Sequence, residues 1–102
     1  MILESAYLHI KDGQTTAFET AFKQASHIIA SMDGYITHSL HKCMEDTHLY
    51  LLLVEWETLE AHTEGFRGSN GYQEWKRLLH HFYEPFPTVY HFEEVALDAE
   101  NK

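Results

Sequence analysis

The stretch "LYLLLV", residues 49–54, decides the fold because it has the length of a β-strand and is apolar at every position. An antiparallel strand with one face in water normally alternates apolar and polar residues. The side chains of this stretch divide between the two sides of the strand as Leu49, Leu51 and Leu53 against Tyr50, Leu52 and Val54. Both faces of the sheet that contains this strand therefore need to be covered.

Three further segments have the character of strands. Residues 35–44 and 48–56 are separated by the polar sequence "EDT" at residues 45–47, which predicts an antiparallel hairpin. Residues 2–10 alternate loosely and end at the turn sequence "KDG", while residues 88–97 form the last strand-like run. The sequence thus predicts four strands.

A first helix is predicted between Thr16 and Met32. Apolar residues recur there at steps of three and four, which is typical of a helix packed on one side. Thr16 followed by Glu19 predicts a capping box, in which the hydroxyl and the carboxylate each accept from a free backbone N–H. Gly34 is suited to a left-handed C-terminal cap just after this helix.

A second helical region follows the third strand and is interrupted once. Thr58 can cap a first piece whose inward side carries His62 and Phe66. The sequence "GSNG" at residues 68–71 breaks this piece, and helical spacing of apolar residues resumes over residues 72–82. Two prolines end the region.

The order strand, helix, strand, strand, helix, strand is the split β-α-β pattern of the ferredoxin-like fold. We expect an α+β domain over residues 1–97, with a four-stranded antiparallel sheet, and a polar tail over residues 98–102. Both helices cover the same face of such a sheet. We therefore expect a homodimer in which a second copy covers the other face with two-fold symmetry.

The charge of the chain limits its partners. The chain has 16 acidic residues against 7 lysines and arginines, a formal net charge of -9. This field repels nucleic-acid phosphates and anionic lipid surfaces, so we expect neither nucleic acid nor membrane as a partner. Cys43 is the single cysteine and cannot form an internal disulfide, and no apolar run approaches the roughly 20 residues of a spanning helix. We expect a cytoplasmic protein.

Aromatic rings and histidines concentrate between residues 54 and 82. His62 lies on the inward side of its helix and is the candidate catalytic residue, as a general base, or an axial ligand. The alternative is a half-buried histidine bonded to a backbone carbonyl. The candidate substrate-binding residues, for which ordinary core packing is the alternative, are Phe22, Trp56, Phe66, Tyr72 and Trp75.

The histidines lack the spacing of a metal site. His38 and His41 are three apart on a strand, so their side chains emerge on opposite faces. His80 and His81 are adjacent on a helix, roughly 100 degrees apart, and at most one can point inward. We therefore expect no intrinsic metal ion.

Two phrases resemble the antibiotic biosynthesis monooxygenase family of dimeric α+β barrels. They are "EWETLEAHTEGFRGSNGYQEW", residues 55–75, and "PTVYHFEEV", residues 87–95. The features shared with that family are an aromatic that ends the third strand, a "LEAH" helix start, and a serine followed by an aromatic, here Trp56, residues 59–62, Ser69 and Tyr72. The element order also matches over nearly the whole chain.

This resemblance implies a cavity between the sheet and the helices of each subunit, which in the family holds a flat aromatic substrate, a quinol or haem. Some members oxygenate aromatic substrates without metal or flavin. Others degrade haem with an Asn on the first strand and a Trp and a His on the second helix. Those three positions fall near Ala6, near Gly65, and near Trp75 or Lys76, so the haem-degrading set is absent as such.

Three functions are therefore open. The first is a monooxygenase acting on a flat aromatic or quinol-type small molecule, without a cofactor. The second is a non-catalytic small-molecule-binding or stress-related dimeric barrel. The third is a haem-degrading monooxygenase, which leaves haem as the one candidate cofactor.

Overall fold

The computed structural model describes residues 1–97, and its elements follow the predicted order. The strands are β1 (Ile2–His9), β2 (Tyr35–Lys42), β3 (Leu49–Trp56) and β4 (Val89–Phe92). The helices are α1 (Thr15–Ala30), the π-helix η1 (Ala61–Phe66), α2 (Asn70–Leu79) and the 3-10 helix η2 (His80–Phe82). The predicted tail, residues 98–102, lies outside the described residues.

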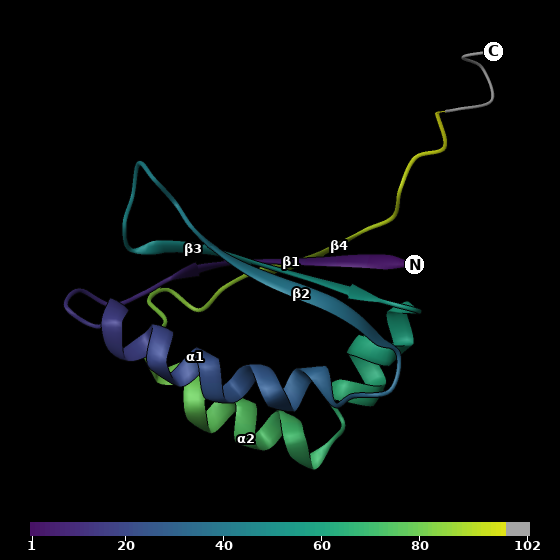
Figure 1. Ribbon diagram of the computed structural model, residues 1–102, viewed down its shortest axis with the longest axis horizontal. Helices are drawn as coiled ribbons and strands as arrows, with labels where there is room; N and C mark the ends of the chain where they lie inside the picture. The colour runs from purple at the N-terminus through teal and green to yellow at the C-terminus, as the bar shows by residue number, and fades with distance from the viewer. Residues whose placement is uncertain (98–102) are drawn as a thin grey trace.

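The four strands form one antiparallel sheet in the order β2-β3-β1-β4. The central strand β1 pairs with β3 from Ile2 opposite Trp56 to His9 opposite Leu49. The hairpin of β2 and β3 is confirmed. Figure 1 shows α1 and α2 side by side on one face of this sheet, which is the predicted ferredoxin-like arrangement.

The two sides of β3 have different environments. Tyr50, Leu52, Val54 and Trp56 face the helices, and each is 3% exposed or less. The three leucines on the opposite side of the strand are only partly buried. The helices therefore complete the core on one face of the sheet and leave the other face without a layer of its own.

The open face of the sheet is rich in apolar side chains. Tyr7 of β1 is 46% exposed, and Tyr90 and Phe92 of β4 are each 51% exposed. In the strand register, Tyr7 lies opposite Leu51 and Phe92 lies opposite Leu3, so these side chains adjoin on one surface. No helix of the described part of the chain packs on this surface (Figure 1).

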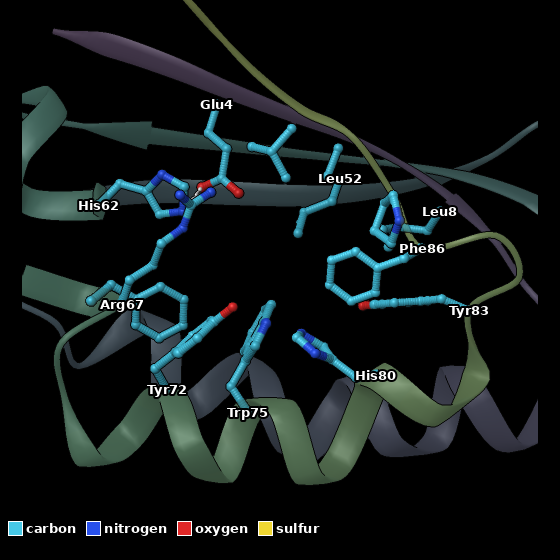
Figure 2. Close-up of a pocket in the computed structure, with 14 residues that line it drawn as sticks. Glu4, Leu8, Leu52, His62, Arg67, Tyr72, Trp75, His80, Tyr83 and Phe86 are labelled. Atoms are coloured by element: carbon cyan, nitrogen blue, oxygen red, sulfur yellow. Dashed lines mark ion pairs between the residues drawn. The ribbon is translucent and has the colours of Figure 1, made fainter. Parts of the chain in front are cut away.

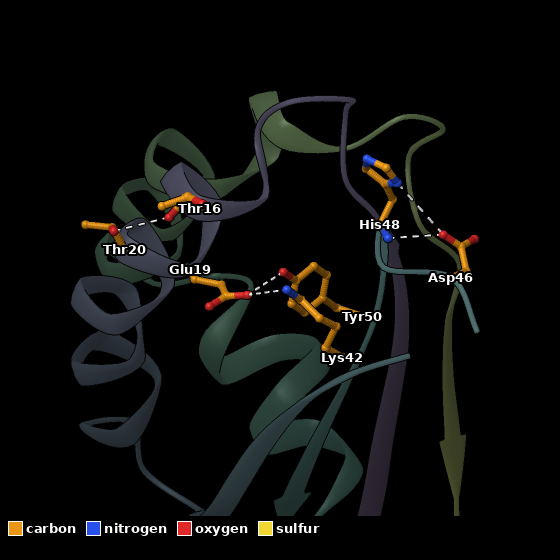
Figure 3. Close-up of polar contacts among 7 residues, drawn as sticks. All are labelled: Thr16, Glu19, Thr20, Lys42, Asp46, His48 and Tyr50. Atoms are coloured by element: carbon orange, nitrogen blue, oxygen red, sulfur yellow. Dashed lines mark hydrogen bonds and ion pairs between the residues drawn. The ribbon is translucent and has the colours of Figure 1, made fainter. Parts of the chain in front are cut away.

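The predicted capping box at the start of α1 is wrong. The residue before the helix, Gln14, makes no side-chain cap, and the carbonyl of Thr16 accepts a hydrogen bond from the hydroxyl of Thr20. Glu19 turns toward the sheet, where it accepts from the Tyr50 hydroxyl at 2.5 Å and pairs with Lys42 at 3.2 Å (Figure 3). Both contacts lower the pKa of Glu19, and the hydrogen bond from Tyr50 has the larger effect. A lysine and a phenol across the fold thus outcompete the local backbone N–H.

The last strand is shorter than predicted, four residues in place of the run over residues 88–97. β4 pairs only with β1, along Leu3 to Ala6, and the pairing ends where Phe92 lies opposite Leu3. Beyond Leu3, β1 has almost no residues left to pair with. The residues that follow Phe92 therefore alternate in sequence but form no strand. The other predicted boundaries shift by about two residues or fewer.

Gly34 adopts the left-handed conformation that its position predicts, with φ of 82°. Helix α1 ends earlier, with Ser31 as its C-cap, so Gly34 forms the turn into β2 instead of the cap. Its carbonyl accepts from the backbone N–H of Glu57 at 2.7 Å. A Cβ added at Gly34 would lie 2.6 Å from the Cβ of Ala61, so this turn packs directly on the start of η1.

We expect Gly34→Ala to destabilise the protein more than Gly13→Ala does. Both glycines have positive φ, and an alanine in that conformation costs about 1–2 kcal/mol. Only at Gly34 does the new methyl group meet a neighbour, which adds a further ~1–3 kcal/mol, whereas nothing lies within 4 Å at Gly13. Urea unfolding followed by circular dichroism measures both losses. Equal losses would contradict the close approach of the turn to η1.

Candidate functional site

A pocket of about 380 Å³ lies between the inner face of the sheet and the second helical region (Figure 2). The sheet contributes Glu4, Ala6, Leu8, Leu52 and Val89. The helical region and the loop after it contribute His62, Phe66, Arg67, Tyr72, Trp75, His80, Tyr83, Phe86 and Pro87. A cavity of this size, with apolar walls and a few polar groups, is typical of small-molecule sites.

One wall of the pocket is aromatic. The ring of Phe66 lies edge-on to Tyr72 at 5.2 Å and to Trp75 at 5.5 Å between centroids. The structure thus brings together three of the predicted substrate-binding residues. Phe22 packs behind Trp75 at 5.7 Å, and Trp56 lies behind His62; neither lines this pocket. A direct ligand contact of Phe22 or Trp56 stays a prediction.

The π-helix η1 places His62 at the end of the pocket. Thr58 caps its start as predicted, by accepting from the backbone N–H of Ala61 at 3.1 Å. The wider turn of a π-helix puts residues four apart close to one side, so His62 and Phe66 both point inward and are 3% and 2% exposed. The imidazole of His62 stacks on the indole of Trp56 at 5.4 Å.

A chain of polar side chains surrounds His62. Its Nδ1 lies 2.8 Å from Nε2 of His91, and its Nε2 lies 3.4 Å from Oε1 of Glu4. The indole N–H of Trp56 donates to the same Glu4 oxygen at 2.9 Å. His62 is therefore held by two side chains, and a bond to a backbone carbonyl is not what holds it. Both of its ring nitrogens face protein groups.

Burial governs the charge of these groups. It lowers the pKa of His62 to about 3, and the charges of Arg67 and His91 act in the same direction. Burial also lowers the pKa of His91, again with Arg67. Burial raises the pKa of Glu4, although the Trp56 hydrogen bond and Arg67 oppose this. The low-dielectric end of the pocket thus favours the uncharged form of each group.

Glu4, Arg67 and His91 belong to this end of the pocket but were not predicted from the sequence. Glu4 carries a detectable signal, because it alternates with Ala6 and Leu8 on the inward side of β1, where a carboxylate is out of place. His91 alternates with Val89 in the same way, but the strand that holds it is short. A charged residue at an inward position of a strand is a functional candidate.

The positions of the histidines can be compared with the spacing argument made from the sequence. His38 faces inward and bonds the Tyr35 hydroxyl at 2.5 Å, while His41 bonds Ser39 on the other side, so these two histidines do diverge. His80 lines the pocket.

Over residues 1–97, no three side chains of His, Cys, Asp or Glu gather in a way that could hold a metal ion. Within the same range, no helix is both long and apolar enough to cross a membrane.

We expect His62 to stay neutral as the pH falls to about 4, because its pKa is about 3 in the folded protein and 6.5 in the reference state. The unfolded chain takes up this proton first, so the contribution of His62 to stability is complete above pH 6.5 and is lost as the pH falls toward 3. The chemical shift of its Cε1–H, assigned with a His62→Gln variant, measures the titration. A midpoint near pH 6 would contradict the burial of the ring.

Three comparisons with known proteins agree with this architecture. The family model for antibiotic biosynthesis monooxygenase matches residues 1–78. YczJ, an uncharacterised protein of Bacillus subtilis strain 168, is 70% identical over 95 residues, which is 93% of this chain and all of that protein.

Two solved structures are similar to the whole domain. A protein from Bordetella bronchiseptica, whose name places it with antibiotic biosynthesis monooxygenases, is 32% identical with a TM-score of 0.89 over 93% of this chain and 97% of its own. SnoaB, a cofactor-independent oxygenase from Streptomyces nogalater, is 14% identical and shares the fold, with a TM-score of 0.81 over 96% of each chain. The chain belongs to the antibiotic biosynthesis monooxygenase family.

Proposed function

We propose that this protein is a monooxygenase that binds a flat hydroxyaromatic or quinol-type molecule in the pocket and acts without metal or flavin, in the cytoplasm. The observation that carries the proposal is the pairing of an aromatic wall with a buried polar chain at one end of a single pocket (Figure 2). The rings of Phe66 and Trp75 offer faces and edges to a planar ligand. The polar side chains at the end of the pocket offer an acceptor for the proton of the ligand's hydroxyl group.

The proposed chemistry needs only the ligand and molecular oxygen. Removal of the hydroxyl proton leaves an electron-rich aromatic anion, which can itself supply electrons to oxygen. The protein would hold the ring plane against Trp75 and Phe66 and exclude water from the reacting edge. Membership of the antibiotic biosynthesis monooxygenase family supports this reaction class.

Haem is the cofactor that the family resemblance leaves open, and the residues present do not fit it well. Among the described residues, two histidines line the pocket. Both ring nitrogens of His62 lie against Glu4 and His91. Only His80 is therefore left to present a nitrogen as an axial ligand, and no second axial histidine is available among the described lining residues. Ala6 and Gly65 stand near two positions where haem-degrading relatives carry functional side chains. We therefore propose that the site works without haem.

We expect the protein to consume oxygen when it is mixed with a reduced naphthoquinol or a dihydroxynaphthalene. Trp75→Leu should lower kcat/KM by about 2- to 10-fold, because it removes one ring contact with the ligand, worth about 0.5–1.5 kcal/mol. Phe18→Leu is the matched control, since Phe18 is a buried aromatic residue of the core that does not line the pocket. An oxygen electrode measures both. Saturable binding of these compounds without oxygen uptake would instead support the non-catalytic binding protein.

We propose that a second copy of the chain covers the open face of the sheet. Tyr7, Tyr90 and Phe92 are about half exposed and Leu51 is partly buried. Completing the burial of these four side chains is therefore worth about 3–6 kcal/mol before the cost of association. The hydroxyl oxygen of Ser5 is also buried there without a hydrogen-bond partner among the described residues. A partner sheet would bring polar groups and apolar cover to the same surface.

The dimer is tested by Leu51→Glu. A carboxylate in the middle of the apolar open face should shift the protein to a monomer at micromolar concentration, because the charge would have to be desolvated on association. Gln24→Glu adds the same charge at an exposed position of α1 and should leave the dimer intact. Sedimentation velocity measures both variants. A wild-type protein that is monomeric yet cooperatively folded would contradict the proposed assembly.

A further inference from the structure

Glu4 is the buried carboxyl group of the pocket, and its two oxygens have different surroundings. The side chain descends from the centre of the sheet and is 5% exposed. Trp56 donates to Oε1 at 2.9 Å, and Nε2 of His62 lies 3.4 Å from the same atom. Figure 2 shows one carboxyl oxygen toward His62 and the other toward the cavity. Oε2 is thus the acceptor atom that this cluster leaves to a ligand.

We propose that Glu4 is the residue that takes the proton from the hydroxyl group of the ligand, and that His62 is a positioning residue that holds the Glu4 carboxyl. This inference rests on the proposed function, because it assigns a role within the same pocket. The sequence indicated His62 as the candidate general base, and the proposal assigns this role to Glu4 instead.

The geometry of His62 is the reason for the reassignment. A general base must present a lone pair to the proton that it removes. The Nδ1 of His62 meets His91, its Nε2 faces Glu4, and its ring lies between the rings of Trp56 and Phe66 at 5.4 and 6.2 Å. Neither nitrogen is presented to the cavity. His62 can orient Glu4, but it cannot reach a ligand without first leaving these partners.

The proposed step is balanced within the pocket. The O–H bond of the ligand breaks, an O–H bond forms at Oε2 of Glu4, and the electron pair of the broken bond stays on the ligand oxygen. One negative charge therefore moves from Glu4 to the ligand. Arg67 follows η1 and lines the same pocket, so its guanidinium is placed to stabilise the new anion.

The charged and titratable groups that face Glu4 come from three directions. His62 and Arg67 approach from η1 and the residue after it, and His91 lies opposite Glu4 in the pairing of β1 with β4. Tyr83, which follows η2, lines the pocket and interacts electrostatically with Glu4. Burial raises the pKa of the Glu4 carboxyl against the influence of Trp56 and Arg67, which makes its carboxylate a stronger base than one in water.

Glu4→Gln tests the catalytic role with little change of shape. The amide oxygen can still accept from Trp56, but the side chain cannot take a proton. We expect kcat for a hydroxyaromatic substrate to fall about 10²- to 10⁴-fold with little change in KM, and the acid limb of the pH profile to disappear. Glu57→Gln, at an exposed position after β3, should match the wild type. An unchanged kcat in Glu4→Gln would overturn the proposal.

A second experiment does not depend on turnover. At about pH 8 4-nitrophenol is largely ionised in water, and two anions that share a desolvated site cannot both keep their charge. We expect the wild type to take up about one proton per bound 4-nitrophenol and Glu4→Gln to take up none, as measured by calorimetry in two buffers of different ionisation enthalpy. 4-Nitroanisole, which lacks the hydroxyl, should cause no uptake in either protein.

The two experiments separate this inference from the proposed function. Proton uptake that depends on Glu4, in a protein that consumes no oxygen, would support hydroxyl recognition by Glu4 and reject the oxygenase. Oxygen consumption by a protein that binds 4-nitrophenol without proton uptake, or that fails to bind it, would overturn the role of Glu4 and leave the oxygenase standing.

Discussion

The inner side of β3 is the constraint on which the site depends. Tyr50, Leu52, Val54 and Trp56 are buried between the sheet and the helices, and they form the apolar layer against which the pocket is built. Trp56, at the end of that layer, also makes two contacts with the polar end of the pocket. Its ring stacks on His62, and its indole N–H donates to Glu4. The same residue that closes the core therefore sets the orientation of the polar end of the pocket.

Burial explains why this polar end is chemically unlike the surface of the protein. The chain carries a formal charge of -9, and a carboxylate on such a surface would simply remain ionised. At the buried end of the pocket, desolvation raises the pKa of Glu4 and lowers those of His62 and His91. The pKa of the Glu4 carboxyl lies above its ordinary 4.5 while that of His62 falls to about 3, so of these two groups the carboxylate is the better acceptor for a proton from a ligand.

The sequence predicts the fold more completely than the site because the two depend on different information. Periodicity of two for "LYLLLV" and of three and four for the helix from Thr16 reports which side of each element is buried, and this was enough for the element order. The polar chain joins Glu4, His62 and His91, which lie on three separate elements. Only the register of β1 with β4, and the π-helical turn that carries His62, bring these residues together. The capping box failed for the same reason, since Glu19 found Tyr50, 31 residues away.

The open face and the pocket are opposite sides of the same strands, and this links assembly to the site. Along β1, Glu4, Ala6 and Leu8 point into the pocket while Ser5 and Tyr7 point to the open face. A partner packed on the open face would hold the twist and spacing of β1 against β3 and β4, and hence the register that places Glu4 opposite His91. A proton transfer over hydrogen-bond distance is sensitive to small changes in this register. The second copy would therefore contribute to the geometry of the site through the strands that the two faces share.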